Sequence, residues 1–90
     1  MEPTDAAAAY LSEVERICSN DPRLSTLGGG ILAGITLNIA HDSRSFSRLL
    51  GIEHALVLRE VQHLSELGLI AIEARDGRTQ RCRYRVVPPA

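Results

Sequence analysis

Residues 66–86 read ELGLIAIEARDGRTQRCRYRV, and they combine the end of a helix with an arginine-rich β-hairpin. Beyond position 80, arginine alternates with apolar side chains, so a strand here has two chemically different faces. The arginines of one face are Arg81, Arg83 and Arg85, and the apolar side chains of the other are Cys82, Tyr84 and Val86. The alternation predicts that one face packs on the core and the other is cationic.

The hydrophobic pattern also limits the length of the hairpin loop. If the loop after Arg75 is three or five residues long, Ile70 and Ile72 share a face with the apolar side chains of the second strand. A loop of even length would set Ile72 against an arginine. The sequence therefore predicts an odd loop, and in the three-residue register Glu73 opposes Arg81 and can pair with it.

Length and composition indicate one small globular domain covering residues 1–90. The chain is 44% hydrophobic and 23% charged, which is ordinary for a globular protein. A chain of this size buries a smaller fraction of its surface than a longer one, so its core is thin and a partner subunit would help. With three aromatic side chains in all, the interior is expected to be aliphatic.

Positive charge is concentrated near the C-terminus although the net charge is −1. Residues 1–40 carry two arginines against five acidic residues, whereas residues 75–85 carry five arginines against one aspartate. Local potential decides where a phosphate backbone docks, and arginine presents a planar fork to phosphate or guanine. A solvated strand face, or a GC-rich genome that favours arginine codons, is the ordinary alternative. The excess of arginine favours phosphate binding.

Several functional classes find little support in the sequence. Cys18 and Cys82 have no nearby Cys or His partner, so we expect two reduced core thiols and neither a zinc site nor a redox pair. His54 and His63 lie on opposite sides of one helix, so they cannot share a metal ion within one chain. No apolar segment is long enough to span a bilayer and no leader is evident, so we expect a cytoplasmic protein.

Catalysis is not indicated either. The run Gly28–Ala33 superficially fits a dinucleotide-binding pattern, but no strand precedes it and no βαβ unit follows. No nucleophile and base, or paired carboxylates, stand in a recognisable arrangement, and a domain this small leaves little room for a substrate pocket. We therefore expect a protein that is not an enzyme and that uses no cofactor.

The N-terminal third predicts an amphipathic helix over residues 4–20, with Thr4 as its N-cap. Tyr10, Val14 and Ile17 recur at helical spacing on one side. This helix is an arm that packs either on its own domain or on a second subunit.

Three further helices are expected before the hairpin. The second covers Ile31 to Ala40, because glycine disfavours a helix and Gly28–Gly30 should precede it or form its start, while Gly34 permits close approach of a neighbour. The third, Phe46 to Leu50, is capped by Ser43 or Ser45 and stops at Gly51. The fourth runs from Glu53 to Leu67 before Gly68, with Val57, Val61, Leu64 and Gly68 on its inner side and Ala55, Arg59, Gln62 and Glu66 on its outer side.

A short helix, a glycine turn, a longer helix and a basic hairpin in this order resemble the winged helix-turn-helix of bacterial MarR-like and ArsR-like transcription regulators. The resemblance covers residues 31–87, and it is carried by Phe46–Ile52, by Val57, Arg59, Val61 and Leu64, by Glu66–Ile70 and by Asp76–Arg78. It implies a mainly α fold with a small β-hairpin wing and an extra N-terminal helix.

The resemblance also implies roles for individual residues. Residues 46–50 would form the positioning helix and residues 53–67 the recognition helix in the major groove. The base-contacting residues would be His54, Ala55, Leu58, Arg59 and Gln62, and the backbone and wing contacts would be Ser43, Ser45, Arg75, Arg78, Arg81 and Arg83. The implied function is transcription regulation by a homodimer on double-stranded DNA, and Tyr10, Val14 and Ile17 would join the two copies.

The recognition helix departs from the family pattern, and this keeps a second hypothesis open. Relatives commonly have small hydroxyl residues early in this helix, whereas this chain has Ala55, Leu56 and Leu58, with Glu53 and Glu60 nearby. We expect Leu56 to pack on a neighbouring helix, and an exposed Leu58 would suit a protein partner. The alternative function is therefore a winged-helix adaptor that binds another protein through this helix.

Overall fold

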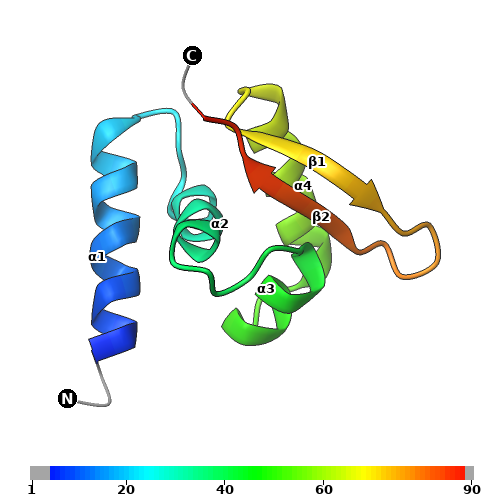
Figure 1. Ribbon diagram of the computed structural model, residues 1–90, viewed down its shortest axis with the longest axis horizontal. Coiled ribbons are helices and arrows are strands. Elements are labelled where there is room, and N and C mark those ends of the chain that lie inside the picture. The colour runs from blue at the N-terminus through cyan, green and yellow to red at the C-terminus, as the bar shows by residue number, and fades with distance from the viewer. Residues whose placement is uncertain (1–4, 89–90) are drawn as a thin grey trace.

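The computed structural model describes residues 5–88, which form four helices followed by a two-stranded antiparallel hairpin (Figure 1). The elements are α1 (Asp5–Asn20), α2 (Thr26–Thr36), α3 (Ser43–Leu50), α4 (His54–Glu66), β1 (Ile70–Arg75) and β2 (Cys82–Val86). In Figure 1, α1 lies at one end of the molecule and the hairpin loop projects at the other. The expected class, mainly helical with a small hairpin, is confirmed, and the layout is compatible with a winged helix. The predicted N-cap Thr4 lies outside the described residues.

The glycine triplet lies inside α2, and this corrects the predicted helix of residues 31–40. The helix begins at Thr26, where the Ser25 hydroxyl accepts a hydrogen bond from the Gly28 backbone N–H at 3.0 Å. It ends at Thr36, and the chain then turns through Asn38 at a φ of 60°. Within the described residues, three consecutive glycines thus stand in a continuous helix despite their low helix propensity.

Close packing of α1 on α2 explains the glycines. A Cβ atom on Gly30 would lie 2.8 Å from the Tyr10 hydroxyl oxygen, and one on Gly29 would overlap the Cys18 sulfur. A Cβ atom on Gly34 would make only an ordinary contact, 3.6 Å from a ring carbon of Phe46. The close approach predicted for Gly34 therefore occurs at the triplet instead.

The inner face of α1 is used within the domain. Val14 is 7% exposed, and Tyr10 and Ile17 are half-buried against α2. The Tyr10 hydroxyl donates to the backbone carbonyl of Gly30 at 3.0 Å. Of the two alternatives for this helix, packing on its own domain is the one observed. The three residues predicted to join two copies therefore pack within the domain, although Tyr10 and Val14 also line a surface hollow between α1 and α3.

A tight turn joins α3 to α4. Asp42, rather than Ser43 or Ser45, caps α3, because its carboxylate accepts from the Ser45 backbone N–H at 2.8 Å. The predicted stop at Gly51 is confirmed, and its φ of 65° is a left-handed conformation that glycine adopts without strain. Helix α4 begins at His54, after Glu53 as its N-cap. The short connection through Gly51 therefore sets the direction in which α4 leaves α3.

The inner face of α4 forms the centre of the core. Val57, Val61 and Leu64 are at most 1% exposed, as the helical periodicity predicts, although Gly68 beyond the helix is exposed. These side chains pack with Ile31, Phe46, Ile70, Cys82 and Tyr84. Leu58 is half-buried against the same cluster, whereas Leu56 is 43% exposed. The predicted positions of these two leucines are thus reversed.

The hairpin starts in the predicted five-residue register and then changes it. Ile70 pairs with Val86 and Ile72 with Tyr84, which places the apolar residues of both strands on one face as predicted. A β-bulge at Glu73 shifts the pairing by one residue beyond that point, so the six residues 76–81 follow the last pair and the predicted odd loop is wrong. The three-residue register is wrong, and so is the pairing of Glu73 with Arg81 that depended on it. The Glu73 carboxylate instead lies 3.5 Å from the Arg85 guanidinium.

Candidate nucleic-acid interface

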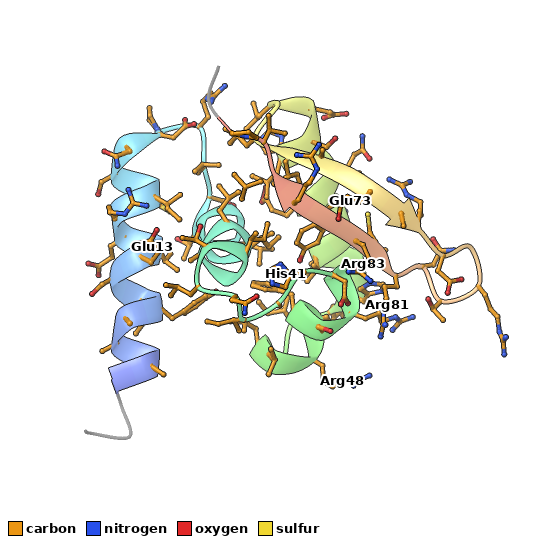
Figure 2. All side chains as sticks on the ribbon, in the orientation of Figure 1. Glu13, His41, Arg48, Glu73, Arg81 and Arg83 are labelled. Atoms are coloured by element: carbon orange, nitrogen blue, oxygen red, sulfur yellow. The ribbon has the colours of Figure 1, made fainter. Side chains whose placement is uncertain are left out.

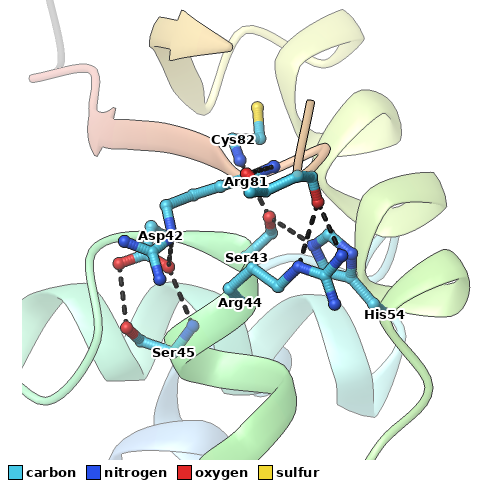
Figure 3. A network of polar contacts seen from close by, with 8 residues as sticks. Asp42, Ser43, Arg44, Ser45, His54, Arg81 and Cys82 are labelled. Atoms are coloured by element: carbon cyan, nitrogen blue, oxygen red, sulfur yellow. Dashed lines mark hydrogen bonds and ion pairs between the residues drawn. The ribbon is translucent and has the colours of Figure 1, made fainter. Parts of the chain in front are cut away.

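The first turn of α3 is tied to the hairpin by three consecutive residues (Figure 3). We call the set Asp42, Ser43, Arg44, Thr79 and Arg81 the α3–hairpin junction. Arg44 donates to the backbone carbonyl of Thr79 from Nε at 3.0 Å and from Nη2 at 2.6 Å. The Asp42 carboxylate lies 3.5 Å from the Arg81 Nε. The hairpin loop is therefore held against α3 rather than projecting freely from its strands.

Ser43 forms the buried centre of this junction. Its side chain is 0% exposed, and its hydroxyl oxygen accepts from the Cys82 backbone N–H at 2.9 Å. The same oxygen lies 2.7 Å from the His54 Nε2. When Nδ1 carries the proton of a neutral imidazole, the Ser43 hydroxyl donates to Nε2, and when Nε2 carries it the hydroxyl oxygen accepts. The sequence-based assignment of Ser43 to phosphate contact is wrong, because no part of the side chain reaches solvent.

Ser45 and Asp42 form a second internal pair. The Ser45 hydroxyl donates to Asp42 at 2.9 Å, in addition to the backbone hydrogen bond of the cap. Burial alone would raise the pKa of Asp42, but the hydrogen bonds from Ser45 and the charge of Arg81 outweigh it and lower that pKa. Both donors of Ser45 are thus engaged with a carboxylate, so the predicted phosphate contact of Ser45 is not supported.

His54 is half-buried at the start of α4 and does not present a free edge to a ligand. Burial lowers the pKa of His54, the positive charge of Arg44 lowers it further, and Asp42 opposes both effects. Its Nε2 is engaged with a buried hydroxyl, so this nitrogen is not available for the predicted base contact.

This environment gives a testable pH dependence. The His54 pKa is lower in the folded protein than its ordinary value of about 6.5, so over the interval between the two values the unfolded chain binds more protons. The contribution of His54 to the free energy of unfolding is therefore fully present above about pH 6.5 and is lost as the pH falls through that interval. Urea unfolding measured across this range checks it. The variant His54→Gln should lack this part of the pH dependence, and identical profiles for both proteins would contradict the assignment.

The outer face of α4 carries the remaining predicted base-contacting residues. Ala55, Arg59 and Gln62 are exposed and follow one another along the helix at turn spacing. Leu58 does not belong to this set, because it packs on the core. The exposed stripe of α4 therefore contains one small apolar, one cationic and one amide side chain.

The β-bulge brings Arg75 to this stripe. Without the bulge, strict alternation from Ile72 would turn Arg75 to the face that carries Arg83. With it, Arg75 pairs with the buried Cys82 and lies on the sheet face toward α4. The Arg75 Nη2 lies 3.5 Å from the Oε1 of Gln62, which joins hairpin and helix on one side of the molecule.

The other hairpin arginines occupy different surroundings. Arg83 and Arg85 are exposed, as the alternation predicts, but they lie on the sheet face turned away from α4, where Arg85 contacts Glu73. Figure 2 shows Arg81 and Arg83 on the hairpin beside α3. Arg78 is exposed in the loop, and its backbone N–H donates to Asp76 at 2.9 Å. The five arginines of residues 75–85 are therefore divided between two faces of the hairpin and its loop.

Sequence reasoning missed Arg44 and Asp42. Neither residue stands out by spacing, because Arg44 reaches a backbone carbonyl 35 positions later in the chain. A signal for Asp42 was present, since aspartate is a favoured N-cap residue. This signal competed with two nearby serines, which are favoured N-caps as well.

An apolar surface lies away from the hairpin, between α1 and α3. Leu11, Leu27 and Leu50 line a hollow of about 350 Å³, and Ile39 and Leu49 line a neighbouring one of similar volume. Leu11 and Leu49 are each 60% exposed. A third hollow, of about 380 Å³, lies between α2 and α4 and is lined by Leu27, Leu56 and Arg59 among others.

The geometry defines a small, mainly helical domain in which the exposed face of α4 and the cationic hairpin meet on one side. No protein-family model matches the chain, and no curated protein or solved structure matches it either. Among residues 5–88, no helix is both long and apolar enough to cross a bilayer. In the same range no three His, Cys, Asp or Glu side chains are grouped so that they could hold a metal ion.

Proposed function

We propose that this chain is a winged helix-turn-helix protein that binds double-stranded DNA and regulates transcription. Helix α4 would enter the major groove as the recognition helix, and the hairpin would act as the wing. The observation that carries the proposal is the single surface made by Arg59 and Gln62 of α4 with Arg75 of the hairpin. The tie between Arg44 and Thr79 supports it, because a wing held in place is ordered before it meets DNA.

The proposed contacts follow from exposure. Arg59, Gln62 and Ala55 face the bases, while Arg75 and Arg78 hold the backbone. Arg81 contributes less, because a phosphate must compete with Asp42 for it. Arg83 is not part of the proposed surface, since it lies on the face of the hairpin turned away from α4.

Salt dependence tests DNA binding directly. In anisotropy titrations of a labelled duplex between about 50 and 200 mM salt, log Kd should rise linearly with log salt concentration. Arg75→Ala and Arg78→Ala should each flatten the slope by about 0.9, the release expected for one lost phosphate contact. The matched control is Arg16→Ala, which removes the same charge from α1 at the opposite end of the molecule. An affinity that does not respond to salt, or an equal effect of the control, would contradict the proposal.

We further propose that two copies act as a homodimer through the apolar surface between α1 and α3. An isologous interface needs one patch that offers both protruding and hollow parts. Leu11 and Leu49 protrude, and the hollow that Leu50 lines lies between them. Sedimentation equilibrium should show a dimer that Leu49→Glu converts to a folded monomer, and a monomeric unmodified protein would refute the dimer while leaving DNA binding open.

A protein-binding adaptor is the second candidate, and the exposure of Leu56 favours it. Leu56 and Leu27 line the hollow between α2 and α4, which a partner's apolar side chain could fill. Leu56→Arg separates the two functions. It should abolish capture of a protein partner if the chain is an adaptor, and it should maintain or raise DNA affinity if the chain binds DNA.

A further inference from the structure

The bulge at Glu73 has a chemical consequence for the proposed DNA-binding surface. It turns Arg75 toward α4, so that a guanidinium N–H lies 3.5 Å from the amide oxygen of Gln62, at the long end of the hydrogen-bonding range. A glutamine side chain ordinarily offers both an acceptor, Oε1, and a donor, Nε2. With Arg75 beside Oε1, the Nε2 of Gln62 is the group that stays available as a donor to a ligand.

Arg59 lies three residues before Gln62 on the same exposed stripe of α4. Neither Arg59 nor Arg75 forms an ion pair within the described residues. The acidic neighbour of Arg59 in the sequence, Glu60, is engaged elsewhere, because it accepts a hydrogen bond from the Ser25 hydroxyl at 2.7 Å. The three side chains Arg59, Gln62 and Arg75 therefore present N–H donors to solvent, and we call them the donor surface.

Guanine and adenine offer different hydrogen-bonding groups to such a surface. In the major groove, guanine presents two acceptors, N7 and O6, and no donor. Adenine presents one acceptor and one donor, and an unengaged glutamine pairs with both. A glutamine whose oxygen faces an arginine loses this match to adenine and retains its donors for guanine.

From this geometry we infer that the donor surface selects guanine in the major groove, and that Arg75 sets this preference by orienting Gln62. The inference rests on the proposed function and makes it more specific. It assigns guanine to Gln62, whereas an isolated glutamine would read adenine. Arg75 is accordingly a specificity-determining residue as well as a phosphate contact.

Base analogues isolate the major-groove edge. Three duplexes of about 20 base pairs, long enough for two half-sites one helical turn apart, share one sequence with several guanines. The first contains guanine, the second inosine, which keeps N7 and O6 but lacks the minor-groove amino group, and the third 7-deazaguanine, which lacks N7. Anisotropy competition at fixed salt gives the relative affinities. We expect guanine and inosine duplexes to bind equally and the 7-deazaguanine duplex to bind about tenfold more weakly, the size of one good base contact.

Two variants with the same change in charge complete the test. Arg75→Gln frees the oxygen of Gln62, so the penalty for 7-deazaguanine should fall by the share that Gln62 contributes, and the contact of Arg59 with N7 accounts for what remains. Arg83→Gln removes one positive charge from the opposite face of the hairpin and should keep the tenfold penalty. Equal binding of all three duplexes, or an unchanged penalty in Arg75→Gln, would overturn the inference while salt-sensitive binding persists. Loss on inosine as large as on 7-deazaguanine would also overturn it, because the minor groove would then be read. Absence of salt-sensitive binding to any duplex would instead remove the proposed function itself.

Discussion

Ser43→Ala is expected to lower the free energy of unfolding by about 2 to 3 kcal/mol. The variant leaves the Cys82 backbone N–H without its acceptor in a part of the core where Cys82 is 1% exposed. It also removes the hydroxyl that forms a hydrogen bond with His54. A buried donor without a partner has lost its hydrogen bonds to water and forms no hydrogen bond within the protein. Urea unfolding should show a lower midpoint with an unchanged slope, since the surface exposed on unfolding stays the same.

Ser45→Ala is the matched control for this prediction. It removes a hydroxyl from the same helical turn, but Ser45 is only half-buried and its partner Asp42 keeps the backbone hydrogen bond of the cap. The expected loss is below about 1 kcal/mol, the usual net contribution of one hydrogen bond. Equal losses for both variants would contradict the role assigned to the buried hydroxyl of Ser43.

Gly29→Ala is expected to destabilise the domain by about 2 kcal/mol, although alanine is the better helix former. The added Cβ atom would overlap the Cys18 sulfur and lie 3.5 Å from the Val14 carbonyl oxygen, so α1 and α2 must separate or Cys18 must change rotamer. Gly34→Ala provides the contrast. Its Cβ atom meets Phe46 and the Ala40 carbonyl oxygen at ordinary van der Waals distances, so this variant should be neutral or stabilising by up to about 1 kcal/mol.

A double-mutant cycle with Cys18→Ala locates the cause of the Gly29 effect. In the Cys18→Ala background the sulfur is absent, and Gly29→Ala should no longer destabilise. The two changes should therefore couple by about 2 kcal/mol, which is typical of residues in direct contact. Additive losses would show that the cost arises from the backbone of α1 rather than from the sulfur. Thermal or urea unfolding of the four proteins gives the cycle.

The elements that sequence reasoning located correctly are those that local chemistry determines. Helix α4 follows from the spacing of Val57, Val61 and Leu64, and its start and end follow from Gly51 and Gly68, which both adopt positive φ. The inward face of the hairpin follows from the alternation of its residues. Each of these signals lies within a few positions of the element that it specifies.

Features set by distant contacts were misjudged. Glycine propensity predicted that α2 starts within or after the triplet, and the packing of α1 against that triplet outweighed propensity. Two alternatives stayed open for the inner face of α1, its own domain or a second copy, because the sequence does not reveal which apolar face it meets. Asp42 and Arg44 were overlooked for the same reason, since their partners lie far along the chain.

The candidate site shows the same division. The exposure of Arg59 and Gln62 was predictable from the helical wheel, and their meeting with Arg75 was not. Alternation from Ile72 places Arg75 on the wrong side, because a bulge adds one residue that the periodicity does not contain. Burial of Ser43 was equally hidden, since a serine near a helix start is ordinarily a cap.

Glu73, the extra residue of the bulge, determines how homologues of this chain should be aligned. Removing it leaves Ile72 inward, Ala74 outward and Arg75 inward, which is the regular two-residue alternation of a strand. A one-residue gap at this position would therefore leave every side chain on its present face. A gap at a position from Ile70 to Ile72 would instead turn the side chains before it to the opposite face of the sheet. Homologues with a shorter β1 are thus compatible with the same surface chemistry only when the missing residue is the one at position 73.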